Sequence, residues 1–152
     1  MAIIDSLIEF GENFDLDQEA GNYLFTNTYD LGLAGRDIGN GQPLYLNIAV
    51  TEAFTDGGDS ATLTLQLRSD DSTSIHASTS SLHFQTGAML KEALVLGAQM
   101  SFPIPLEGVV PYEQYLGLQA VVATAGFDSG MITAWLSHEP TGGWKALPEG
   151  QN

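Results

Sequence analysis

Apolar and polar residues alternate with a period of two along most of the chain after Thr26. Successive side chains of a β-strand point to opposite faces, so this period predicts strands with one buried face. The clearest stretch follows Pro43, and further stretches have the same pattern. The apolar positions are Leu44, Leu46, Ile48 and Val50; then Leu63, Leu65 and Leu67; then Leu116, Leu118, Ala120 and Val122; and finally Ile132, Ala134 and Leu136.

Turn-forming residues separate these stretches. The loop Thr55–Ser60 contains Gly57 and Gly58 between two strongly alternating runs, which predicts a hairpin. A weaker strand is expected around Leu82–Phe84, and Pro103 and Pro105 make the stretch from Met100 an edge strand or partly irregular. Gly39-Asn40-Gly41 is expected to form a tight turn before the Leu44 strand.

These elements amount to about seven or eight strands, spaced as in a sandwich. Strands do not alternate with helical segments, so a parallel sheet with crossover helices is not expected. The predicted fold class is all-β, an antiparallel, jelly-roll-like β-sandwich with a short N-terminal helix or arm.

The first residues have a different period. Ile3, Ile4, Leu7, Ile8, Phe10 and Phe14 recur at helical spacing, with acidic residues between them. We therefore expect residues 1–26 to be an arm and linker, 27–140 the sandwich domain and 141–152 a C-terminal tail. The acidic residues within this apolar stretch and the missing cationic region argue against a secretory signal.

The charge balance narrows the possible partners. The chain has 19 Asp and Glu against 4 Lys and Arg, a formal net charge of −15, and the four cations are scattered. Phosphate contacts need clustered Lys and Arg, so neither nucleic acid nor an anionic membrane is an expected partner. There is no cysteine, which excludes disulfides and thiolate metal sites.

Motifs for catalysis or cofactor binding are weak. The glycine-rich stretch from Gly32 to Gly41 lacks the Gly-Lys-Ser/Thr ending of a phosphate loop, and turn geometry explains its glycines better. His76, His83 and His138 are not spaced as metal ligands, and no serine lies in a nucleophile elbow. We expect no catalytic residue, no cofactor and no enzymatic activity, although distant residues can still assemble a site.

Two other hypotheses come from the loops and the aromatic residues. Paired acids at Asp15 and Asp17, Asp56 and Asp59, and Asp70 and Asp71 offer oxygen ligands for calcium, but none has EF-hand spacing and solvated turns are favoured. Tyr112, Tyr115, Trp135 and Trp144 are candidates for a carbohydrate groove, although core and interface positions are favoured for them. A cupin-like metal enzyme would need histidines on neighbouring strands facing one cavity.

Three parts of the chain carry a resemblance to a known family: Gly35–Leu46 with Val50–Phe54, Pro105–Leu106 with Tyr112–Gly117, and Gly130–Leu136. They resemble the capsid cement proteins of Bordetella-phage-type tailed bacteriophages. The resemblance implies a jelly-roll-like sandwich that sits on the outside of a phage head, as a small homo-oligomer, and clamps neighbouring major capsid subunits. It also implies that the protein is in the host cytoplasm during assembly and on the capsid exterior in the virion. The family has no catalytic residues that could be assigned to positions of this chain. A carbohydrate- or receptor-binding module of a phage particle is the alternative.

Apolar residues outside the sandwich pattern are the candidates for contact with partners. Met131 and Trp135 lie on the second face of the last strong strand, which needs only one apolar face for the core. The apolar positions of the arm have no place in a sheet ladder if it is helical. The expected interface to the capsid or to further copies, a dimer or trimer, is Ile3, Ile4, Leu7, Ile8, Phe10, Met131 and Trp135.

Overall fold

The computed structural model describes residues 9–32, 42–106 and 110–140. Residues 2–8 of the expected arm, the expected Gly39-Asn40-Gly41 turn and the tail with Trp144 lie outside these ranges. The described elements are the strands β1 (Glu9–Asp15), β2 (Gly21–Leu24), β3 (Tyr29–Asp30), β4 (Tyr45–Thr55), β5 (Thr62–Asp70), β6 (Ser81–Gln85), β7 (Gln99–Pro103), β8 (Tyr115–Ala123) and β9 (Ser129–Ser137), and the 3₁₀ turn η3 (Lys91–Ala93).

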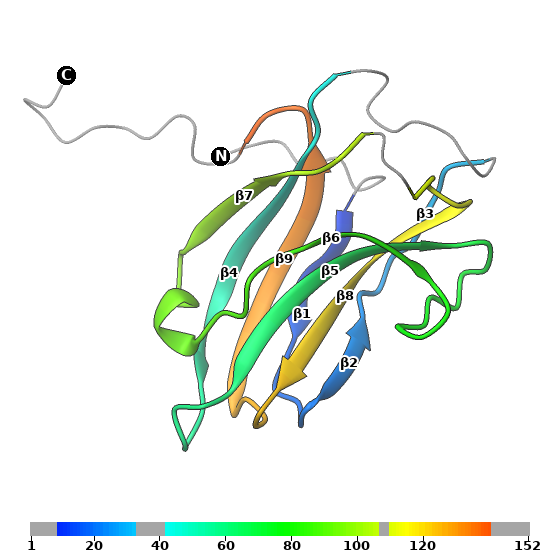
Figure 1. Cartoon of the computed structure of the whole chain (residues 1–152). Coiled ribbons are helices and arrows are strands. Elements are labelled where there is room, and N and C mark those ends of the chain that lie inside the picture. Colours follow the sequence, from blue (N-terminus) through cyan, green and yellow to red (C-terminus); the bar gives the residue numbers. More distant parts are fainter. Residues whose placement is uncertain (1–8, 33–41, 107–109, 141–152) are drawn as a thin grey trace, which may run out of the picture.

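The strands form two antiparallel sheets that pack face to face (Figure 1). Sheet A has the order β1-β9-β4-β7, and sheet B has the order β2-β8-β5-β6 with β3 also paired to β8. With β3 set aside, this is the strand order of a jelly roll built from two four-stranded sheets. The predicted all-β sandwich is therefore confirmed.

The core lies between the sheets and consists of the alternating residues of the four central strands. Leu46 and Ile48 from β4 are fully buried, as are Leu63 and Leu65 from β5. β8 and β9 contribute the matching positions from the other half of the chain, among them Leu118, Ala120, Val122, Ile132, Ala134 and Leu136. The predicted inward faces are thus confirmed.

The helix expected near the N-terminus is wrong for the described part of that segment. Residues 9–15 form strand β1, which pairs with β9 and has register shifts on both sides of Gly11. Phe10 and Phe14 are four residues apart, a spacing that fits one face of a strand as well as one face of a helix. Irregular pairing hides the period of two, and Asn13 has a φ of 48°.

Residues 9–26 consequently belong to the sandwich and do not form a separate arm and linker. β1 is an edge strand of sheet A, and β2 is an edge strand of sheet B. Phe10 is 2% exposed in the core, and Phe14 stacks on Phe25 with ring centroids 4.2 Å apart. In the acidic stretch after β1, Leu16 is buried and residues 17–20 are exposed.

The hairpin predicted between β4 and β5 is also wrong. The two strands lie in different sheets, so the loop at Asp56–Ala61 carries the chain from one layer to the other (Figure 1). The carboxylate of Asp56 holds this crossing by accepting hydrogen bonds from the backbone N–H groups of Ser60 and Ala61, each at 2.8 Å. Glycines indicate a change of direction, but they do not say which strands pair.

β7 is an edge strand, one of the two alternatives expected from Pro103 and Pro105, because it pairs with β4 alone. β6 forms the expected strand around His83 and pairs with β5. The strands β2 and β3 were not predicted; they have 4 and 2 residues, too few for a period to be visible.

Gly130 on β9 lies where this strand packs closely against Phe54 of β4. Its φ is 147°, and a Cβ at this position would lie 2.5 Å from the ring of Phe54. We expect Gly130→Ala to lower the free energy of unfolding by at least about 2 kcal/mol, because the rare backbone conformation and the overlap each cost on the order of 1–3 kcal/mol. Urea unfolding measures this change.

Gly87→Ala is the matched control, because a Cβ at Gly87 meets nothing within 4 Å. Equal stability of the two variants would contradict the packing described for Gly130.

Candidate functional site

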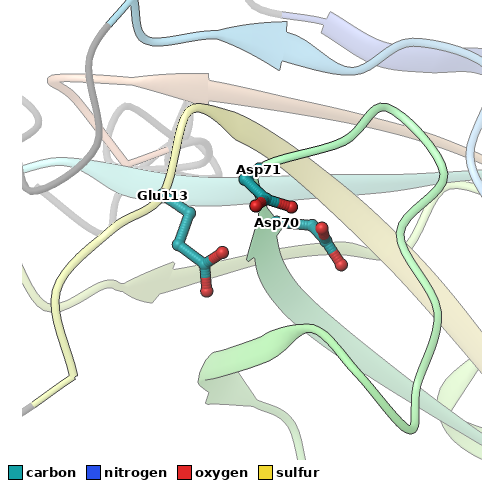
Figure 2. A group of neighbouring side chains, drawn as sticks. All are labelled: Asp70, Asp71 and Glu113. Carbon is teal, nitrogen blue, oxygen red and sulfur yellow. The ribbon is translucent and has the colours of Figure 1, made fainter.

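Three carboxyl groups gather where β5 ends and the segment before β8 passes (Figure 2). Asp70 is the last residue of β5, Asp71 follows it, and Glu113 lies two residues before β8. One oxygen of each carboxyl group lies within 4.8 Å of the others. The alternation of β5 did not reveal this group, because Glu113 joins it only through the pairing of Asp70 with Tyr115.

The proximity of these groups changes their proton affinity. A side-chain hydrogen bond to Asp70 raises the pKa of Asp71, and the negative charges of Asp70 and Glu113 raise it further. Hard cations such as Ca²⁺ take carboxylate oxygens as ligands, so Asp70, Asp71 and Glu113 are the described residues that would hold one. Two of the groups also have protein partners, since Asp70 accepts from the backbone N–H of Ser72 and Glu113 from the hydroxyl of Ser81.

All three acidic pairs identified in the sequence serve turns. Asp15 accepts a hydrogen bond from the backbone N–H of Asp17 at 2.9 Å, as Asp70 does from Ser72 at 3.1 Å. Asp56 holds the loop between the sheets and forms an ion pair with Lys91. Backbone hydrogen bonds from Ala61 and Ser60, together with Lys91, lower the pKa of Asp56 despite its desolvation.

A second polar cluster lies beside the carboxyl groups, around His83 on β6. Its Nε2 atom lies 2.6 Å from Oγ of Ser69, and this oxygen accepts the backbone N–H of Glu113 at 2.9 Å. The imidazole stacks on the ring of Tyr112 with centroids 4.0 Å apart. In a neutral imidazole with its proton on Nδ1, Nε2 accepts the hydroxyl proton of Ser69; in the other neutral tautomer, Nε2–H donates to Oγ, which has a second lone pair for it.

This pair does not present a nucleophile. Ser69 is 0% exposed, and its hydroxyl joins β5 to β6 and to the segment before β8. Burial lowers the pKa of His83, and the negative charge of Glu113 opposes this shift. The cluster therefore holds strands together through a neutral histidine.

Arg68 holds the loop that follows β5. It is 8% exposed, and its guanidinium donates to the carbonyl oxygens of Ala77 and Ser80 and to the side chain of Gln66. Both ion pairs in the described part of the chain belong to Lys91, so carbonyl dipoles and not a carboxylate surround this charge. Desolvation accordingly lowers the pKa of Arg68.

Some of the residues predicted to contact partners lie outside the described ranges, and the others are buried or half-buried. Ile3, Ile4, Leu7 and Ile8 lie outside the described residues. Phe10 is in the core of its own sandwich, Trp135 is 5% exposed, and Met131 is half-buried, so the predicted open apolar face on β9 is small. Nearby Asn47 is also buried and donates to Oγ of Ser137 at 2.5 Å, which places polar contacts on this outer face.

The residues needed for a carbohydrate groove or a cupin-like site do not come together in the described ranges. Tyr112 and Trp135 are buried, and Tyr115 is half-buried. The one group of potential metal ligands found there contains no histidine. No described helix is long and apolar enough to cross a bilayer.

The strand order defines a jelly-roll protein. Hydrogen bonds made by the side chains of Arg68 and Ser69 hold the described segments after β5 and before β8. The model of the Bbp16 family matches residues 21–136, which is more than half of the chain, and the protein belongs to this family. The family's name suggests a Bordetella phage protein. No curated protein matches the chain.

His83 gives a prediction for stability against pH. Because its pKa is lowered in the folded protein, stability is fully present above the unfolded pKa of about 6.5 and declines as pH falls through the folded pKa. We expect His83→Gln to flatten this decline in urea unfolding measured between about pH 7.5 and 5. His76→Gln, on the exposed loop, should retain it, and a decline that is the same in all three proteins would contradict the assignment.

Asp71 gives a second prediction, of opposite sign. A carboxyl group with a raised folded pKa destabilises the protein while ionised, and this penalty disappears as pH falls below the folded pKa. Asp71→Asn should raise the melting temperature at pH 7, and the gain should shrink toward about pH 3.5, where most carboxyl groups are protonated. Glu19→Gln removes one charge from an exposed stretch and should give a smaller gain; equal gains would mean that only net charge matters.

Proposed function

We propose that this protein is a non-enzymatic cement or decoration protein that binds the outer surface of a tailed-phage head and stabilises contacts between major capsid subunits. The observation that carries this proposal is the match to the Bbp16 family over residues 21–136, whose name suggests a Bordetella phage protein. The jelly-roll sandwich is compatible with a structural role in the virion.

The proposed stabilisation of the shell follows from preferential binding of the protein to the closed capsid lattice. A subunit that binds the closed lattice but not the ruptured one stabilises the closed lattice by its binding free energy. Such a subunit should transmit force without unfolding locally. The core of fully buried leucines and the loops held by Asp56 and Arg68 give the sandwich this rigidity.

The proposed partners are the major capsid protein and further copies of this chain, as a dimer or trimer. The net charge of −15 argues against nucleic acid and membrane as partners. Of the four cations, Arg68 is buried and Lys91 is ion-paired, while Arg36 and Lys145 lie outside the described residues. The proposed location is the capsid exterior, with host cytoplasm during assembly.

Binding to heads tests the proposal. Heads of the phage that encodes this chain, assembled without it, should bind the purified protein in co-sedimentation and rupture at a higher temperature once it is bound. Heads already carrying the protein should bind no more of it. Binding to glycans without binding to heads would contradict the proposal and favour the carbohydrate-binding alternative.

The predicted interface role of the N-terminal residues is tested by a deletion that leaves β1 intact. Removing residues 2–14 would take away most of β1 and the buried Phe10, and should lower the melting temperature strongly, since removing a buried Phe side chain alone costs about 3–5 kcal/mol. Removing residues 2–8 spares both. We expect the shorter deletion to leave the thermal melt unchanged and to weaken oligomerisation or head binding. Undiminished assembly by this shorter variant would contradict an interface role for Ile3, Ile4, Leu7 and Ile8.

A further inference from the structure

The connection from β6 to β7 exposes a group of large apolar side chains. Leu90, Val95 and Leu96 are 44%, 53% and 68% exposed, and they are three of the five exposed large hydrophobic residues in the described ranges. They lie on either side of η3, where the chain passes from sheet B to sheet A at the side of the sandwich (Figure 1). We call residues 90–96 the η3 loop.

Backbone hydrogen bonds fix this loop to both sheets. The carbonyl oxygen of Leu94 accepts from the N–H of Phe54 at 3.1 Å, and the N–H of Gly97 donates to Val50 at 3.0 Å. On the other side, Met89 and Leu63 exchange two hydrogen bonds of 2.8 Å. Leu94 itself is fully buried in the core. The apolar side chains are therefore held outward by a loop that is anchored at both ends.

Lys91 adds a third attachment. Its ammonium lies 3.5 Å from Oδ1 of the buried Asp56 and also pairs with the exposed Asp59. These interactions raise the pKa of Lys91, the interaction with Asp59 contributing most, so it is charged at neutral pH. The only described cation near the loop is thus bound within the chain and is not free to pair with a partner's acid.

The surroundings of the apolar residues are acidic. Glu92 lies exposed between Leu90 and Val95. Glu52 lies exposed on β4 between Phe54, which is hydrogen-bonded to Leu94 of the loop, and Val50, which is hydrogen-bonded to Gly97 directly after it. An apolar centre with a polar, charged rim is the usual anatomy of a protein–protein interface. Carboxylates at the rim select a partner that presents Lys or Arg opposite them.

We propose that the η3 loop is a docking surface for a protein with an apolar depression bordered by Lys and Arg. This inference rests on the proposed function, in which that protein is the major capsid protein of the shell. A second copy of this chain is a poorer occupant, because a symmetric contact would bring Glu92 and Glu52 against the same acids at a net charge of −15 per chain.

Serine substitutions on the full chain test the proposal. Leu96→Ser, and the double variant Leu90→Ser with Leu96→Ser, should melt like the unaltered protein, since these side chains are exposed. Their affinity for heads assembled without the protein should fall at least about tenfold, as expected when the burial of a leucine side chain against the partner is lost. Leu82→Ser, on β6 and 39% exposed, is the matched control and should bind normally.

Charge reversal tests the chemistry of the partner. Glu92→Lys should weaken head binding mainly at low salt and reduce its salt dependence, because long-range attraction between exposed charges is screened. Weaker binding that leaves the salt dependence unaltered would overturn the basic character of the partner. Loss of self-association in Leu96→Ser, measured by light scattering, would show that the η3 loop binds a second copy of this chain. This result would overturn the assignment of the loop to the capsid protein.

The outcomes separate this inference from the proposed function. If the unaltered protein does not bind heads, the proposed function fails and the docking surface fails with it. If the unaltered protein, Leu96→Ser and Leu82→Ser all bind equally, the proposed function stands and the η3 loop is overturned as the docking surface.

Discussion

Alternate side chains of β4, β5, β8 and β9 meet in one core, and the geometry of the other features depends on this packing. Burial of one face of each strand determines the register, because a shift of one residue would turn the apolar set outward. With the central strands in place, β1 and β2 close one side, and β6 and β7 form the other. The η3 loop connects the strands of that second side, which is why it runs along the outside of the sandwich (Figure 1).

The strongly alternating strands were predictable from the sequence because their positions obey a single period. β1 was not, because Phe10 and Phe14 fit two periods and because the bulges beside Gly11 disturb the alternation. The hairpin prediction failed for a different reason. The glycines before Ser60 mark a turn, but only the packing of distant strands determines that β4 and β5 belong to different sheets.

The polar clusters were only partly visible in the sequence. Asp70 and Asp71 were recognised as a pair, whereas Glu113 reaches them through the register of β5 against β8. Ser69 and His83 are likewise joined by strand pairing over 14 positions. The stretch from Ala93 to Ala98 is apolar and does not follow the alternation of the neighbouring strands. That break in the pattern was a signal that residues outside the core lie here, although it did not show which of them are exposed.

A rigid sandwich, an acidic surface and an outward apolar loop are the three features that support the proposed capsid role. Under the proposed function, cryo-electron microscopy of the phage particle whose genome encodes this chain is the most direct test. We expect density for the sandwich on the outside of the head, across a boundary between major capsid subunits, with the η3 loop toward the shell. A head whose outer surface carries no such density, or density for the sandwich at the tail, would contradict the proposed capsid-cement role.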